Sequence, residues 1–151
     1  MCIGKGFIAV KGSDKLLYEM DSNDHAPIVK KYNLKDDALI NRTFVRLEVL
    51  PSGSLTSQEV KDWGVKIDEV GTLPSWFEEE KEMWLTKVIN EMVDIIIPLW
   101  LKNGIGGSLD LQGSQVKDLG KLEKVGGSLD LRGTQVNSIK GIERFKDRII
   151  I

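Results

Sequence analysis

The chain has 151 residues, of which 41% are hydrophobic, and this is enough to bury a core in one domain or in two small ones. Its formal net charge of −2 argues against generic binding to nucleic acid or to an anionic membrane, because both need an excess of Lys and Arg. Cys2 is the only cysteine, so no internal disulfide can form. We expect a cytoplasmic protein without a secretion signal or a membrane span.

The first third of the chain predicts a β-hairpin followed by a short helix. Residues 2–10 and 15–20 are apolar or β-branched runs on either side of a turn-forming cluster. Ser22 or Asn23 can cap the helix that follows, and Asn33 can end it because Asn accepts a left-handed backbone.

Two further strands are predicted in the middle of the chain. Residues 43–50 alternate between aliphatic side chains on one face and Arg46 and Glu48 on the other, as in a central strand of a sheet. The turn residues 51–54 break this strand, and residues 63–70 form the next one.

A long helix is expected to follow these strands. Ser75 and Glu78 match a capping box, in which Ser75 is the N-cap and Glu78 bonds back to its amide. One apolar stripe with helical spacing consists of Phe77, Trp84, Val88, Met92 and Ile95. Pro98 should kink or end the helix.

The end of the chain contains one twenty-residue sequence written twice. Residues 105–124 and 125–144 are identical at ten of twenty aligned positions, with an L-x-L triplet followed by a small polar residue and V-x-x-L. This pattern resembles the leucine-rich repeat in a short form, with Ser114 and Thr134 where that family usually has Asn. In a third copy in the same register, Ile149 and Ile151 would stand where Leu129 and Leu131 stand in the second.

The fold class that follows is α+β. We expect residues 1–103 to form a small antiparallel sheet with a long helix, and residues 104–151 to form a leucine-rich-repeat-like β-solenoid tail. The L-D-L triplets would be short parallel strands with leucines inward.

The outer face of these strands is one candidate binding surface. Its residues are Ser108, Asp110, Gln112, Ser128, Asp130 and Arg132. Asp110 and Asp130 could attract a cationic group of a partner, or they could be a solvated row partly neutralised by Arg132. Two carboxylates are few for a metal ion, so neither a metal nor a cofactor is predicted.

The last residues form a second candidate surface. The apolar edge consists of Arg148, Ile149, Ile150 and Ile151. An unpaired apolar edge invites strand pairing, so we expect a homodimer or a higher oligomer, the alternative being a monomer with a frayed end.

The sequence does not indicate an enzyme. His25 is the only histidine, and a Cys2–His25 pair is conceivable, but no local signature supports it and we expect His25 on the surface. Arg42, Arg46 and Trp63 could stack on a nucleotide, although the helical spacing of Trp76, Phe77 and Trp84 favours core packing for the aromatic side chains.

The segments FVRLEVLPSG and DWGVKIDEVGTLPSWFEEEKEMW, within residues 44–84, resemble segments of small uncharacterised phage and prophage proteins. That resemblance implies a phage-encoded inhibitor of a bacterial defence system, such as an anti-CRISPR. We therefore expect a non-enzymatic protein that binds by blocking a protein surface. The alternatives are an oligomeric sponge for a nucleotide immune signal and a small hydrolase.

Overall fold

The computed structural model describes residues 2–35, 42–56 and 63–151 and is a mixed α/β protein with a small antiparallel sheet and one long helix. Its elements, in chain order, are β1 (Lys5–Val10), α1 (Ala26–Lys31), β2 (Phe44–Leu50), β3 (Ser52–Ser54), β4 (Gly64–Ile67), α2 (Ser75–Glu91), the π-helical turn η2 (Met92–Ile96), α3 (Ile97–Asn103), β5 (Leu109–Asp110), β6 (Gln115–Asp118), β7 (Leu129–Asp130), the 3₁₀ turn η3 (Glu143–Phe145) and β8 (Ile149–Ile150).

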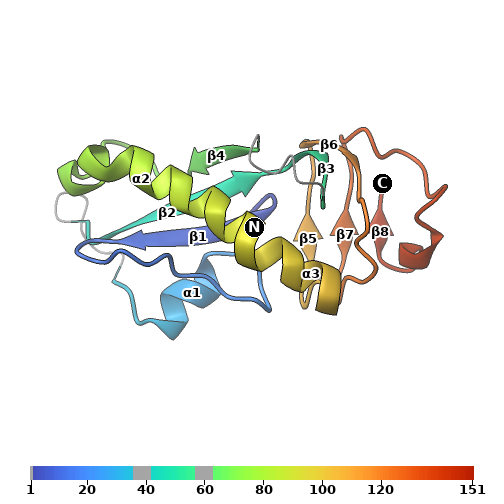
Figure 1. Ribbon diagram of the computed structural model, residues 1–151, viewed down its shortest axis with the longest axis horizontal. Helices are drawn as coiled ribbons and strands as arrows, with labels where there is room; N and C mark the ends of the chain where they lie inside the picture. The colour runs from blue at the N-terminus through green and yellow to red at the C-terminus, as the bar shows by residue number, and fades with distance from the viewer. Residues whose placement is uncertain (1, 36–41, 57–62) are drawn as a thin grey trace.

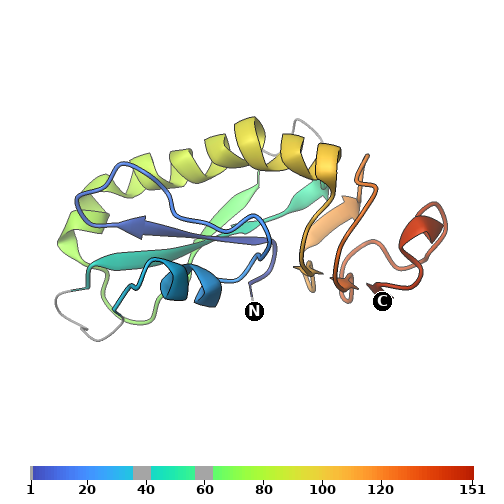
Figure 2. The ribbon, with the colours of Figure 1, turned by 90° about the horizontal axis from the view of Figure 1, so that it is seen from below.

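The antiparallel sheet has the strand order β1-β2-β4, so β2 is central, as its sequence predicts. β1 pairs with β2 from Lys5 opposite Val49 to Val10 opposite Phe44. The long helix covers one face of this sheet and the short α1 lies on the other (Figures 1 and 2). Because both faces are covered, Glu48 is buried although the alternation predicts it on the polar face.

The predicted hairpin of residues 2–10 and 15–20 is wrong as a continuous ladder but right in its antiparallel direction. Residues 15–20 touch β1 through one isolated bridge, between Ile8 and Leu17. Further along the same edge, the amide of Gly6 donates to the carbonyl of Asn23 instead. β1 forms its continuous hydrogen-bonded ladder with β2, whose apolar side chains lie opposite those of β1. Residues 15–20 run irregularly along the other edge of β1.

The predicted caps of both helices are also wrong. α1 has His25 at its N-cap, because Asn23 turns inward, where its amide nitrogen donates to the carbonyl of Ser108. α2 starts at Ser75 with Pro74 at its N-cap, and no side-chain cap forms because the proline side chain has no acceptor atom. The predicted end of α1 is confirmed, since Asn33 has φ 51°.

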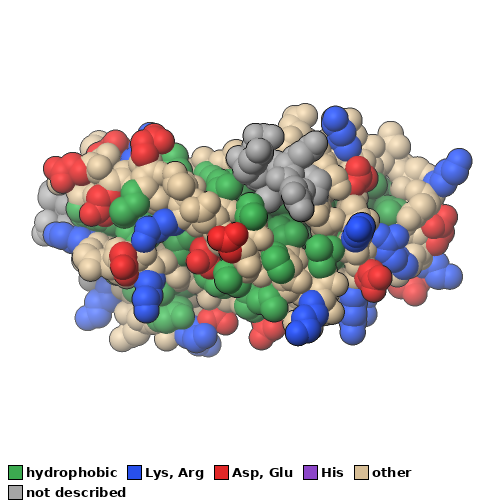
Figure 3. Space-filling view, in the orientation of Figure 1, with side chains coloured by type: hydrophobic (Ala, Val, Ile, Leu, Met, Phe, Trp, Pro, Cys, Tyr) green, Lys and Arg blue, Asp and Glu red, His purple; other side chains and the backbone are tan. Residues whose placement is uncertain are grey.

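The long helix does not stop at Pro98 but passes it through the π-helical turn η2. Pro98 lacks an amide hydrogen and lies in the first turn of α3, where none is needed. A π turn adds one residue, so the buried stripe moves from the predicted Ile95, which is 41% exposed, to Ile96, which is fully buried. On the outward surface over the long helix, Figure 3 shows hydrophobic side chains among charged ones.

The tail, residues 104–151, contains a parallel sheet in the order β5-β7-β8. Leu109 pairs with Leu129, and Leu129 with Ile149, so the predicted pairing of strands twenty residues apart is confirmed. At the other side of this sheet, Ile3 forms a parallel bridge to Asp110.

A second parallel pair, β3 with β6, joins the middle of the chain to the tail, although residues 51–54 were expected only to break a strand. One cluster of buried side chains runs from Phe7 in β1 to Phe145 in η3. The division at residue 103 stays a prediction. Among the described residues there is no helix with the length and apolarity that crossing a membrane requires.

Candidate functional site

Three side chains with reactive or metal-binding atoms meet between the antiparallel sheet and α1. Cys2 precedes β1, His25 is the N-cap of α1, and Asp68 directly follows β4. The Cys2 Sγ lies 3.2 Å from the His25 Nδ1, and an oxygen of Asp68 lies 3.5 Å from the same nitrogen. All three atoms lie within 4.8 Å of one another. We call this group the Cys2–His25–Asp68 cluster.

The orientation of the imidazole is fixed from behind by the central strand. The His25 Nε2 lies 2.7 Å from the carbonyl oxygen of Leu47, which can only accept a hydrogen bond. Nε2 therefore carries the hydrogen, and in the neutral ring the Nδ1 lone pair faces Cys2 and Asp68. Burial lowers the pKa of His25, which favours this neutral form.

The thiol of Cys2 is buried among carboxylates. Burial raises its pKa to about 11, and the nearby charge of Glu48 acts in the same direction. The Cys2 amide donates to a carboxylate oxygen of Asp24 at 2.9 Å. At neutral pH the free side chain is therefore a thiol that can donate to His25, and it is not an activated thiolate nucleophile.

Two adjacent pockets open onto this cluster. One, of about 230 Å³, is lined by Cys2, Asp24, His25, Ala26, Arg46 and Asp68. The other, of about 250 Å³, is lined by Cys2, Asp21, Ser22, Asn23, Asp24, Ser108 and Asp110. Both share Cys2 and Asp24, so the thiol stands between them. Carboxylates dominate the charged groups of both pockets, which favours cations there.

The expectation that His25 lies on the surface is wrong, because it is only 7% exposed. It is buried because α1 packs on the sheet and brings the N-cap residue against β2. The sequence could not place these three residues together, since they come from separate segments that only the β1-β2-β4 pairing brings into contact. The presence of a single cysteine and a single histidine was the only signal available.

The predicted face of the tail divides into two parts. Ser108 and Asp110 line one of the two pockets beside Cys2. Asp130 is bound by Arg132, whose Nη2 lies 2.7 Å from its Oδ2, and this hydrogen bond lowers the pKa of Asp130. The two remaining residues of this face, Gln112 and Ser128, are exposed. Asp130 is thus paired with Arg132 within the chain, and at 8% exposure it is buried rather than solvated.

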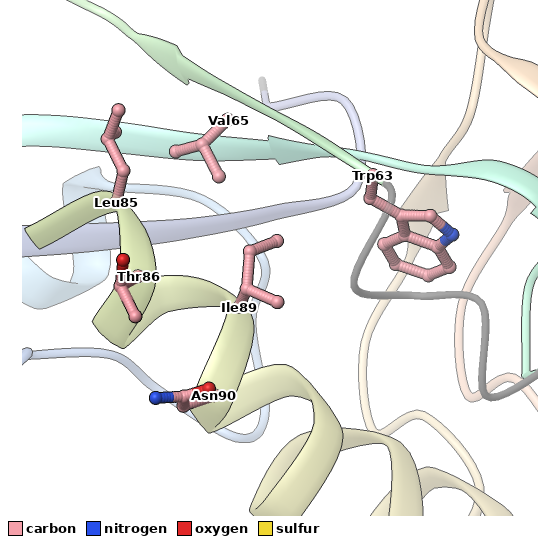
Figure 4. Close-up of a pocket in the computed structure, with 6 residues that line it drawn as sticks. All are labelled: Trp63, Val65, Leu85, Thr86, Ile89 and Asn90. Atoms are coloured by element: carbon pink, nitrogen blue, oxygen red, sulfur yellow. The ribbon is translucent and has the colours of Figure 1, made fainter. Parts of the chain in front are cut away.

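The three residues predicted to stack on a nucleotide do not lie around one pocket. Arg42 and Arg46 both contact the carboxylate of Glu69, at 3.3 and 3.2 Å. Trp63 is 4% exposed and lines a different pocket, of about 390 Å³, between β4 and α2, together with Val65, Leu85, Thr86, Ile89 and Asn90 (Figure 4). A stacking site formed by all three residues has no common cavity among the described residues and stays a prediction.

The predicted edge of the tail is formed by β8 and its flanking residues. Arg148 folds back, with its Nη1 2.6 Å from the carbonyl of Gly126, and Ile149 is half-buried against the core. Ile150 and Ile151 are 40% and 51% exposed. The apolar part of the edge is therefore the last two residues.

No family model, no curated protein and no solved structure matches this chain.

Proposed function

We propose that this chain is a binding protein whose tail is a short leucine-rich-repeat-like β-solenoid, and that the free edge of β8 pairs with a second copy of the chain. The observation that carries the proposal is the hydrogen bonding of β8. The carbonyls of Arg148 and Ile150 accept from the amides of Leu129, in β7, and of Leu131, directly after β7. Successive backbone groups of a strand alternate in direction, so the amide and carbonyl of Ile149 point away from β7.

The side chains beside this edge favour association. The exposed aliphatic groups of Ile150 and Ile151 lie next to unpaired backbone groups, and this combination favours strand addition. The opposite side of the tail sheet is already covered, because the amide of Gly4 donates to the carbonyl of Asp110. Of the two edges of the tail sheet β5-β7-β8, only that of β8 is therefore available among the described residues, which favours a closed dimer over a filament.

The experiment is a measurement of molar mass by light scattering at micromolar concentration. We expect a dimer for the unchanged chain and a monomer for the double variant Ile150→Lys, Ile151→Lys, because edge lysines oppose strand pairing. Ile139→Lys is the matched control: Ile139 is 46% exposed in the tail but lies outside β8. A monomer for the unchanged chain, or the same loss of mass in the control, would contradict the proposal.

The role that we propose for this binding is to occupy the surface of a bacterial defence protein. Its support is the resemblance of residues 44–84 to small phage proteins. A dimer can present two equal copies of the tail face to such a partner. The test is restoration of phage growth in bacteria that carry a defined defence system and express this chain. Absence of protection against every system tested would count against this role. The chain must be expressed at a concentration at which light scattering shows the purified protein to be a dimer.

A further inference from the structure

The Cys2–His25–Asp68 cluster combines three different donor atoms at distances that suit one small cation. A tetrahedral zinc ion has bonds of about 2.3 Å to sulfur and about 2.0–2.1 Å to nitrogen or a carboxylate oxygen. Tetrahedral angles then separate sulfur from nitrogen by about 3.6 Å and nitrogen from oxygen by about 3.4 Å. The structure has 3.2 Å between Cys2 and His25 and 3.5 Å between His25 and Asp68. For these two pairs, binding would require changes of only a few tenths of an ångström, and the third pair, the Cys2 Sγ and the Asp68 oxygen, lies within 4.8 Å.

The group behind the imidazole matches what a metal-binding histidine requires. A histidine ligand usually donates its other ring N–H to a carbonyl or carboxylate, which fixes the tautomer and orients the lone pair. The Leu47 carbonyl accepts from the His25 Nε2 and leaves Nδ1 directed at Cys2 and Asp68. Leu47 is fully buried in the central strand, so this support is rigid.

The charge around the cluster favours a dication. The carboxylates of Asp24 and Glu48 accept from the amides of Cys2 and Ile3, which places both beside the thiol. Asp68 adds a third carboxylate. The guanidinium of Arg46, which lines the same pocket, contacts Glu69 outside the cluster. A bound dication would offset this concentration of negative charge, and the thiol would release its proton to solvent as it becomes a ligand.

We propose that Cys2, His25 and Asp68 bind one Zn²⁺ ion, with the fourth coordination position open to the pocket of about 230 Å³. The donor set selects the metal: a thiolate and an imidazole favour a borderline-soft ion, whereas Mg²⁺ and Ca²⁺ require oxygen ligands. Three protein ligands with one open position are the arrangement of a zinc site that holds an exchangeable water. This proposal does not depend on the pairing of β8.

The position of Asp68 keeps the site accessible. The side chain of Asp68 is 42% exposed, whereas that of His25 is 8% exposed. Zinc can therefore enter from the pocket beside Asp68 and reach the two buried ligands from one side.

The test uses the full chain, freed of metal by a chelator and titrated with Co²⁺ as a spectroscopic substitute for Zn²⁺. A thiolate ligand gives a sulfur-to-cobalt charge-transfer band in the near ultraviolet, and tetrahedral coordination gives intense visible bands. We expect both bands at one equivalent, and their loss when Zn²⁺ is added. The charge-transfer band should be absent in Cys2→Ser. Asp68→Asn should weaken Co²⁺ binding on the order of 100-fold.

The matched control is Asp21→Asn, which removes the same charge from the neighbouring pocket without touching the three ligands. We expect it to change the dissociation constant by no more than about twofold, because exposed charges are screened. Equal weakening by Asp21→Asn and Asp68→Asn would overturn the proposal, since it would show diffuse attraction by acidic residues. Absence of the charge-transfer band in the unchanged chain would overturn it as well.

Two further readouts use the unchanged chain and so do not depend on whether a variant folds. Saturating Zn²⁺ should protect Cys2 from alkylation by iodoacetamide, because the metal occupies the sulfur lone pair; an unaltered alkylation rate would contradict binding at Cys2. Added thiocyanate should shift the visible cobalt bands if the fourth position is exchangeable. Unchanged bands would contradict the open position.

Discussion

The ammonium group of Lys5 gives the sharpest prediction about stability. Lys5 is the first residue of β1 and is fully buried. Its Nζ donates to the carbonyls of Glu19 and Ser22 and to the side-chain oxygen of Asn23. Burial lowers its pKa to about 8 from an ordinary 10.5. This difference corresponds to about 3 kcal/mol by which protonation of Lys5 disfavours the folded state.

The sign of the pH dependence follows from the number of bound protons. Between about pH 8 and 10.5 the unfolded chain keeps the Lys5 proton while the folded chain has lost it. The Lys5 contribution to the free energy of unfolding is therefore complete above pH 10.5 and is lost as the pH falls through 8. Cys2 and Tyr18 act in the opposite direction at higher pH, because burial raises their pKa values to about 11 and about 12.

The assay compares the unchanged chain with Lys5→Met by urea unfolding at several pH values. Cys2 and Tyr18 are present in both proteins, so their effects cancel in the difference. We expect the free energy of unfolding of the unchanged chain, minus that of the variant, to rise by about 2 kcal/mol between about pH 7.5 and 9.5. Lys15→Met, which removes an exposed ammonium group, is the control for the loss of one positive charge. Parallel curves for the unchanged chain and Lys5→Met would refute the reasoning.

Two matched pairs test the packing of the helix and the tail. Ile96→Ala should lower the free energy of unfolding by about 2–5 kcal/mol because it empties a fully buried site, whereas Ile95→Ala, at a side chain that is 41% exposed, should cost less than about 1 kcal/mol. Equal losses of unfolding free energy in these two variants, measured by chemical denaturation, would contradict the explanation that η2 moves the buried stripe from Ile95 to Ile96. Gly126→Ala should destabilise by about 1–3 kcal/mol, because the new Cβ would lie 2.3 Å from the carbonyl oxygen of Gly106. Gly64→Ala, whose Cβ would have no atom closer than 3.8 Å, is its control, and a similar loss of melting temperature in both would refute this explanation.

The sequence was a reliable guide wherever a local pattern decides the structure. The period of twenty residues predicts the parallel pairing of Leu109 with Leu129 and of Leu129 with Ile149, because identical units place identical side chains in one register. The alternating residues 43–50 predict a central strand, and the apolar spacing from Phe77 to Met92 predicts the buried face of the long helix. Each of these patterns is complete within one segment.

Only the tertiary structure decided how the segments meet, and the candidate site depends on those meetings. Asn23 could cap a helix in isolation, but the folded chain uses its side chain between Lys5 and Ser108, so His25 becomes the N-cap and turns inward. No local pattern reports that this histidine then faces Cys2, because their contact requires β1 and α1 to pack on the same strand. The repeat predicts the register of the parallel tail strands from sequence alone, whereas the cluster exists only because three distant segments share one sheet.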